Sequence, residues 1–508
     1  MRYIIGVDVG TSGTKTVLFN QEGVAIASVT VEYSMYQPQN GWAEQDPNEW
    51  WNASVSTIKQ VVTQSGVNPK DISGLGISGQ MHGLVMLDGE GSVLRNSIIW
   101  CDGRTVEECK EITEAIGADR LIEITANPAL TGFTAGKILW IRKHEPGIYA
   151  KCRHIMLPKD YIRYKLTGVF ATEVSDASGM NLLDVADRCW SQEILDKLNI
   201  DRSLLGEMYE SYEITGEITE EAAKVTGLAR GTPVVGGARD NAAAAVGTGV
   251  VENGRAFTTL GTSGVIFAHI DKVSIDPQGR VHTFCAALPG GWTVMSCTLS
   301  AGGSLQWFRN NFCDNEISTA KGMGVDPYEL IAVQASKVPV GANRLLFLPY
   351  LMGERSPLLN PDARGVFFGL SGIHTKRDMI RAVMEGVSYS QRECLDVLAE
   401  MGVSFKEMLA TGGGGKSLFW RQMLADNYNC PVTTVQNQEG PALGAAILAG
   451  VGTGLYDSVP DACRKILKFN QPQQPDTDMV KAYTPYYELY KKVYNSLKDN
   501  FAELAKLQ

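Results

Sequence analysis

The 508-residue chain has little material for a structural metal site or a disulfide framework. Its ten cysteines include no CxxC pair, and its six histidines are scattered along the sequence. Structural zinc needs clustered thiolates or imidazoles, so no such site is expected. We interpret most of the cysteines as reduced core residues, which is typical of a reducing compartment.

Long apolar runs and an excess of basic residues are also missing. No uninterrupted apolar run reaches the ~18 residues of a membrane span, and the first residues lack the pattern of a signal peptide. Lys and Arg total 46 against 56 Asp and Glu, so the net charge is −10. Nucleic acids and anionic membranes bind basic surfaces, so we expect neither as a partner. We expect a cytoplasmic protein with small-molecule partners, and a homodimer is compatible with the sequence.

Glycine, by contrast, is abundant. The 53 glycines are about 10% of the chain against a typical ~7%, and we expect this surplus partly in loops around a ligand. The tetrapeptide GTSG follows an apolar strand at Gly10–Gly13 and again at Gly261–Gly264. Coincidence is one explanation. The explanation we favour is two similarly built α/β halves of about 250 residues. The predicted domains are residues 1–248 and 249–508.

Local patterns predict the first elements. Apolar, β-rich segments indicate strands over 3–10, 16–20 and 24–31, joined by glycine-rich turns. Apolar residues at helical spacing indicate a helix over 47–64. Further helices are expected over 241–246 and 418–427, and an amphipathic pattern predicts a terminal helix over 486–506.

The glycine-rich turns are candidate phosphate loops. Glycine lets backbone N–H groups approach a phosphate, and a Thr or Ser hydroxyl adds a donor, so two GTSG turns could hold one nucleotide. A third glycine run, Thr411–Ser417 (TGGGGKS), differs from the P-loop sequence motif at one position, because Ala410 stands where the motif has its first glycine. Only about 90 residues follow it, too few for the usual βα array, so the P-loop enzyme is a minor alternative.

Polar residues interrupt or end the apolar strands. Asp8 lies inside an apolar strand, where a charge needs a partner, and is either structural or close to phosphates with Mg²⁺. Asp240 precedes a helical segment and is either a helix cap or a general base. Gln80–Gly83 and Trp100–Arg104 follow buried strands, where small ligands bind in α/β folds.

These stretches resemble the FGGY carbohydrate kinases, within the fold shared by actin, hexokinase and heat-shock chaperones. The resemblance spans essentially the whole chain. It is carried by five segments: Asp8–Lys15, Gly132–His144, Leu157–Gly168, Gly353–Pro357 and Gly365–Glu385. It implies an α/β fold of two ribonuclease H-like (actin/hexokinase-type) domains that flank a catalytic cleft.

The resemblance is strongest to family members that act on D-xylulose, and it implies ATP-dependent phosphorylation of that ketopentose to the 5-phosphate. Asp240 would be the general base, and Asp8 would help to position ATP. Both would hold Mg²⁺, mainly through ATP and water. The implied sugar-binding residues are Gln80, Met81, His82, Trp100, Asp240 and Asn241. The implied ATP-binding residues are Thr11, Ser12, Lys15, Gly261, Thr262, Gly302, Gln306, Gly413, Gly414 and Ser417.

One position departs from the family pattern. Arg239 stands before Asp240, where relatives often have glycine, and it would either pair with a phosphate or carboxylate or face solvent. Two further alternatives stay open. One is a kinase of this family for ribulose, a hexulose, a polyol or gluconate, and the other is an actin-fold ATPase that needs no sugar.

Overall fold

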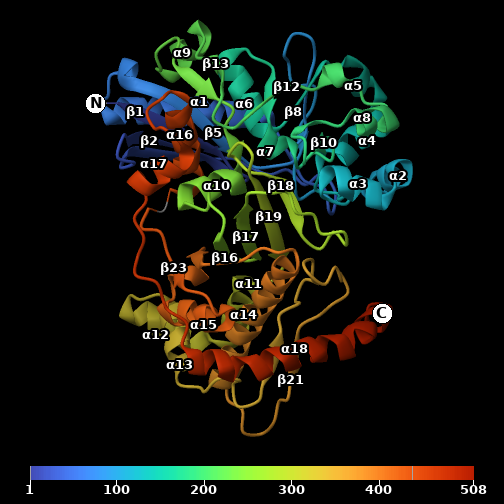
Figure 1. The fold of residues 1–508 in the computed structure, drawn as a ribbon, viewed down its shortest axis with the longest axis vertical. Helices are drawn as coiled ribbons and strands as arrows, with labels where there is room; N and C mark the ends of the chain where they lie inside the picture. Colours follow the sequence, from blue (N-terminus) through green and yellow to red (C-terminus); the bar gives the residue numbers. More distant parts are fainter. Residues whose placement is uncertain (1, 438, 508) are drawn as a thin grey trace.

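Two sheets organise the molecule, one in each half (Figure 1). The computed structural model describes residues 2–437 and 439–507. The first sheet contains β1 (Tyr3–Val9), β2 (Gly13–Asn20), β3 (Ala25–Glu32), β5 (Ile72–Gly79), β13 (Ile214–Glu217), β14 (Pro233–Val235) and β15 (Ala238–Arg239). The second contains β16 (Arg255–Leu260), β17 (Gly264–Ile270), β18 (His282–Cys285), β19 (Trp292–Thr298), β22 (Glu407–Thr411) and β23 (Val432–Thr433).

The two sheets share one pattern of strand pairing. In the first, β1 is antiparallel to β2 and parallel to β5. In the second, β16 is antiparallel to β17 and parallel to β22. Each GTSG sequence therefore joins the first two strands of its sheet, and the interpretation of the echo as two similarly built halves is confirmed.

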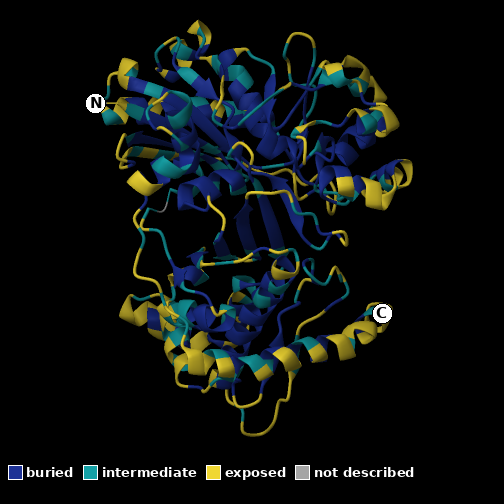
Figure 2. Cartoon of the chain, in the orientation of Figure 1, coloured by how far each residue is buried: buried dark blue, intermediate teal, exposed yellow. Residues whose placement is uncertain are grey.

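Helices cover both faces of the first sheet. Alternate residues of β1 point to opposite faces, so Ile5 and Val7 pack towards α1 and Ile4 packs towards α16. In the second sheet, Leu260 and Ile266 share a core with α14, while Phe257 packs with Ala245 of α10. The main helices are α1 (Pro47–Ser65), α4 (Thr134–His144), α6 (Pro158–Thr167), α7 (Val174–Ala177), α10 (Asp240–Thr248), α11 (Gly302–Phe312), α14 (Lys376–Glu400), α15 (Leu418–Tyr428), α16 (Gly440–Gly452), α17 (Val459–Ile466) and α18 (Thr477–Leu504). Figure 2 shows the buried sheets inside and the exposed residues mainly on the outer helices.

Part of the glycine surplus serves packing rather than loops. Gly6 and Gly76 are paired on β1 and β5, and a Cβ at either would lie within 2.0 Å of a backbone oxygen of α16. Gly444 allows an equally close contact between α16 and α10, because a Cβ added at this position would lie 1.8 Å from the Ala243 carbonyl oxygen. These glycines bring α16 directly onto the sheet and α10 onto α16.

The chain crosses between the halves three times. It first leaves α10 for β16 through residues 249–254. It returns after β23 to α16, which packs on β1 and β5 of the first sheet. It leaves again after α17 through 467–476 towards α18. The second and third crossings pair with each other, with Gln436 N donating to Lys468 O at 2.8 Å and Asn470 N donating to Thr434 O at 2.9 Å.

The local predictions hold, with one correction at the C-terminus. The three opening strands, the helix over 47–64 and the helices after Arg239 and Ser417 all form. The terminal helix, however, begins at Thr477 rather than 486 and continues through Pro485. Tyr483, Tyr487 and Tyr490 pack into the core on both sides of this proline, and their burial offsets the cost of the interruption.

The remaining expectations concern cysteines and membranes. All ten cysteines are free thiols, and six of them are buried. Within residues 2–437 and 439–507, no helix combines the length and apolarity that a bilayer span requires.

Candidate active site

Seven predicted ATP-binding residues meet in one cavity of the second half. Gly261 and Thr262 form the β16–β17 turn, and Gly303 N at the start of α11 donates to Thr262 O at 3.0 Å. On the other side of this turn, a Cβ on Gly412 would lie 2.9 Å from Leu260 O, so the glycine run packs directly against it. Together they enclose about 750 Å³. The predicted residues that line this cavity are Gly261, Thr262, Gly302, Gln306, Gly413, Gly414 and Ser417.

The P-loop alternative does not fit this arrangement. The run Gly414–Lys416 forms a 3-10 turn, and Ser417 caps α15 by accepting from Trp420 N. The Ser417 hydroxyl is therefore engaged in capping α15. In addition, β22 lies in a sheet whose strand pairing repeats that of the first sheet. The glycine run is one wall of a cavity shared with α11 and the β16–β17 turn.

The three predicted ATP-binding residues of the first half lie apart from this cavity. Thr11 accepts a hydrogen bond from Trp100 Nε1 at 2.9 Å and donates to Gln80 Oε1 at 3.4 Å. Ser12 is exposed in the same turn. Lys15 forms an ion pair with Glu439 beside the start of α16. The structure thus connects Thr11 with residues predicted to bind the sugar.

Asp8 and Asp240 carry the charge of the site. Asp8 lies near the end of β1, opposite Ser78 of β5. Burial raises the pKa of Asp8, while the neighbouring Ser78 hydroxyl and the charge of Lys15 lower it. Within the described residues, its Oδ1 is buried without a hydrogen-bond partner. This carboxylate is therefore available to a ligand.

Asp240 is the first residue of α10 rather than its N-cap, and its Oδ1 accepts from Asn241 N at 2.6 Å. Burial is the main cause that raises the pKa of Asp240 to about 6; the charge of Asp8 raises it further, whereas the Asn241 N–H and Arg239 lower it. A carboxylate with a pKa near 6 is ionised at neutral pH and is basic enough to accept a proton.

Three of the predicted sugar-binding residues, Gln80, Met81 and His82, follow β5 and lead to a group of buried aromatic side chains. His82 has a positive φ of 65°, and its ring centroid lies 4.4 Å from that of Phe133. Burial holds the pKa of His82 well below its usual range, so the imidazole is neutral. Met81 precedes it, half-buried, and Asn241 Nδ2 lies 3.8 Å from Met295 Sδ.

Two residues of this region carried no sequence signal that singled them out. Gln45 donates to Thr11 O at 2.7 Å, and its Oε1 accepts from Gln80 Nε2 at 2.8 Å, so it ties the first turn to β5. Lys137 of α4 is buried, and its Nζ donates to the carbonyl oxygens of His82 and Gly132 at 2.8 Å each. Burial lowers the pKa of Lys137 to about 7.

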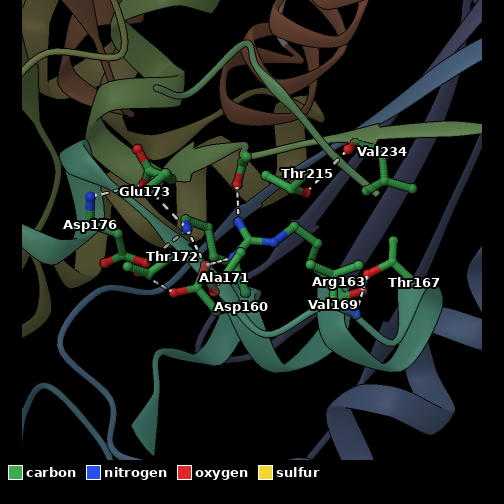
Figure 3. A network of polar contacts seen from close by, with 12 residues as sticks. Asp160, Arg163, Thr167, Val169, Ala171, Thr172, Glu173, Asp176, Thr215 and Val234 are labelled. Atoms are coloured by element: carbon green, nitrogen blue, oxygen red, sulfur yellow. Dashed lines mark hydrogen bonds and ion pairs between the residues drawn. The ribbon is translucent and has the colours of Figure 1, made fainter. Parts of the chain in front are cut away.

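A buried network of charges supports this part of the first half (Figure 3). Asp160 Oδ1 lies 2.6 Å from Lys159 Nζ and 3.0 Å from Arg163 Nη2. Glu173 accepts from Ser175 N at 2.7 Å and from Asp176 N at 2.9 Å, which fixes the start of α7. Ser175 Oγ in turn accepts from Arg239 N at 3.2 Å, so the network supports the residue before Asp240.

The alternative in which Arg239 faces solvent is wrong, because this side chain is fully buried. Its guanidinium carbon lies 3.7 Å from the ring centroid of Phe284, and Nη2 donates to Thr293 Oγ1 at 3.3 Å. No carboxylate of the described residues lies within ion-pair distance of it. Arg239 instead connects the start of α10 to β18 and β19 of the second sheet.

Comparison with known proteins agrees with this arrangement. The family models described as the N-terminal and C-terminal domains of the FGGY family of carbohydrate kinases match residues 3–247 and 256–453. A xylulose kinase from Bacillus subtilis is 38% identical, with 98% of each chain covered. A gluconokinase from Bacillus licheniformis is 33% identical over 100% of this chain and 98% of its own. The crystal structure of a xylulose kinase from Rhodospirillum rubrum superposes with a TM-score of 0.92 at 28% identity, covering 99% of this chain and 100% of that one. The expected two-domain fold is confirmed.

Proposed function

Because this chain belongs to the FGGY family of carbohydrate kinases, we propose that it transfers the terminal phosphoryl group of ATP to D-xylulose, forming D-xylulose 5-phosphate. The observation that carries the proposal is Asp240, whose pKa is raised to about 6 at the start of α10. Sequence similarity to xylulose kinases over nearly the full length supports the choice of sugar.

In the proposed reaction, Asp240 is the general base. Its carboxylate accepts the proton of the sugar 5-hydroxyl as that oxygen bonds to the γ-phosphorus of ATP. The bond from this phosphorus to the bridging oxygen breaks, and ADP leaves with the electron pair. Phosphoryl transfer needs mainly positioning and neutralisation of charge, and closure of the two halves would exclude water as a competing nucleophile.

The two substrates are assigned to two separate groups of residues. We assign ATP to the 750 Å³ cavity, with Gly413, Gly414 and Ser417 beside the adenosine and Thr262 beside the phosphates. Thr11, Ser12 and Lys15 would meet the phosphates from the first half. The sugar is assigned to Gln80, Met81, His82, Trp100 and Asn241. The proposed domain boundary lies between residues 248 and 249, after α10.

Mg²⁺ would be held by Asp8 and Asp240, mainly through ATP and water. The orphaned Oδ1 of Asp8 and the neighbouring charge of Asp240 fit a hard cation with oxygen ligands. When bound, the ion would neutralise charge on the transferred phosphoryl group. The protein contributes the carboxylates that position it.

A coupled ADP-release assay tests the proposal against a panel of D-xylulose, L-xylulose, D-ribulose, L-ribulose, glycerol and gluconate. The expected result is the highest kcat/KM for D-xylulose. A higher value for gluconate would favour the activity named for the gluconokinase relative. ADP release at the same rate without any sugar would contradict the kinase and favour a sugar-independent ATPase.

A further inference from the structure

The segment Gly353–Pro357 contains none of the residues assigned above to the sugar, ATP or Mg²⁺, although its sequence contributes to the family resemblance. It lies between β20 (Leu346–Leu348) and β21 (Val366–Phe368) of the second half. Glu354 of this segment is only 3% exposed. Burying a carboxylate is costly in free energy unless it gains partners, so the partners of Glu354 indicate what it does.

Hydrogen bonds of the backbone hold this segment in place. Glu354 N donates to Asn360 O at 2.8 Å, and Asn360 N donates to Glu354 O at 2.9 Å. Ser356 N donates to Cys297 O of β19 at 3.0 Å, and Ser356 Oγ donates to Arg280 O at 2.7 Å. The backbone of Glu354 is therefore fixed beside the end of β19.

The Glu354 carboxylate binds the turn that follows β19. Its Oε1 accepts from Leu299 N at 2.9 Å and from Arg355 N at 2.7 Å. Leu299 is the first residue of the turn 299–301, which connects β19 to α11 (Figure 1). Among the described residues, Oε2 is buried without a hydrogen-bond partner. The contact between the segment and the turn is thus made by one oxygen atom.

This contact requires an acceptor oxygen rather than a negative charge. Burial raises the pKa of Glu354 to about 7, while the N–H groups of Leu299 and Arg355 lower it. The ionised and the neutral carboxyl group both keep an oxygen that can accept from Leu299 N.

The turn 299–301 in turn contacts the GTSG loop of the second half through the backbone. Ala301 N donates to Thr262 O at 2.9 Å. A Cβ on Gly302 would lie 2.5 Å from Gly261 O, so no side chain separates the start of α11 from this loop. A displacement of the turn would therefore displace Gly261 and Thr262, which line the 750 Å³ cavity.

We propose that Glu354 is a positioning residue, which holds the turn 299–301, and through it the loop at Thr262, in the arrangement that receives the phosphates of ATP. The inference rests on the proposed assignment of ATP to the 750 Å³ cavity. Glu354 is not among the described residues that line that cavity, so it acts through Leu299 and Thr262 and does not touch the nucleotide. A small displacement of groups that bind a substrate is sufficient to weaken their contacts with it.

Two variants of Glu354 and a matched control test this role. Glu354→Met keeps nearly the same volume but removes the acceptor, whereas Glu354→Gln keeps an amide oxygen that can accept from Leu299 N. Asp378→Leu is the control, because Asp378 is also a buried carboxylate of the second half. It accepts from Thr375 N and from Asn343 Nδ2, at 2.7 Å each, and neither partner lines the cavity.

Three measurements are made on the full chain. Isothermal titration with ADP and Mg²⁺, in the absence of sugar, gives the affinity of the nucleotide. Urea unfolding gives the stability of each variant. The ADP-release assay gives the KM values for ATP and for D-xylulose.

We expect Glu354→Met to weaken ADP binding and to raise the ATP KM by at least about tenfold, while the D-xylulose KM stays within about threefold of wild type. Glu354→Gln should bind ADP within about threefold of wild type. Asp378→Leu should bind ADP within about twofold of wild type, even where urea unfolding shows a loss of stability. If Glu354→Met does not fold, Glu354→Asp replaces it, because the shorter side chain withdraws the oxygen from Leu299, and the same loss of ADP affinity is expected.

Three results would overturn the proposal. They are unchanged ADP binding without the acceptor, an equal loss of ADP affinity in Asp378→Leu, and a loss in Glu354→Gln as large as that in Glu354→Met. A wild-type chain that binds ADP but phosphorylates no sugar would contradict the proposed function and leave the role of Glu354 to be decided by the titrations. A wild-type chain that binds no ADP would overturn both.

Discussion

The charge of Asp8, near the end of β1, raises the pKa of Asp240, the first residue of α10. The two carboxylates belong to different elements and are brought together because β15 pairs with β5, which also pairs with β1. Burial and this repulsion outweigh the Asn241 N–H and Arg239, so Asp240 is more basic than an ordinary aspartate.

Replacing Asp240 should abolish most of the activity without unfolding the chain. Asp240→Asn keeps the shape but cannot accept a proton, so kcat should fall by roughly 10²–10⁴ in the ADP-release assay with D-xylulose. Asp271→Asn, at an exposed turn, is the control and should be unchanged. Retention of activity within about tenfold of wild type would contradict the general-base assignment.

The pH dependence follows from the raised pKa. Asp240 must be ionised to act, so the rate should fall as pH decreases through about 6, towards tenfold per pH unit. Asp8→Asn removes a charge that raises the pKa of Asp240. In the pH–rate profile of the activity that this variant retains, the fall in rate on the acidic side should therefore occur at lower pH than in wild type. A rate profile that is flat between pH 5 and 8, or a limb displaced to higher pH in Asp8→Asn, would argue against the coupled pair.

Lys137 should matter for sugar binding although it is far from the surface. Its Nζ satisfies the carbonyl of His82, whose positive φ is unfavourable for a side chain. Lys137→Met keeps the volume but removes this donor from the Gly132 carbonyl, at a cost of about 1–3 kcal/mol. The His82 carbonyl also loses Lys137 but still accepts from Thr134 Oγ1 at 3.2 Å. Urea unfolding should show the lost stability, and the sugar KM should rise more than the ATP KM.

Lys143→Met is the matched control for this experiment. Lys143 belongs to the same helix, is largely exposed, and lies 3.7 Å from Glu108. Exposed pairs contribute little, so both stability and KM should stay near wild type. If the two variants behaved alike, the proposed support of His82 by Lys137 would be refuted.

Local sequence patterns were sufficient to predict the opening strands and the two hairpins that contain the GTSG turns. A GTSG turn after an apolar strand is a short-range signal, and both copies fold into the same pairing of strands. The seven residues of the second half that are predicted to bind ATP converge on one cavity, but that prediction came from a family resemblance rather than from their spacing.

Long-range packing could not be predicted in the same way. Gly6, Gly76 and Gly444 look like ordinary glycines in the sequence, and their purpose depends on α16 returning to the first sheet from the far end of the chain. Gln45 and Lys137 bind backbone carbonyls, which have no sequence signature. The helix across Pro485 forms because tyrosines on both sides of it are buried in the core.

Replacing Lys416 distinguishes this fold from the P-loop enzyme whose motif the run TGGGGKS resembles. Lys416 is exposed, lines the cavity proposed to hold adenosine, and makes no ion pair with a described residue. A single exposed cation contributes about 0.2–1 kcal/mol, so Lys416→Ala should raise the ATP KM by less than about tenfold and leave kcat near wild type. In a P-loop enzyme the lysine contacts the β- and γ-phosphates, and its loss would abolish nucleotide binding. Titration of ATP against Lys416→Ala, with the exposed Lys321→Ala as control, decides between the two, and loss of nucleotide binding in Lys416→Ala alone would contradict our assignment of the glycine run.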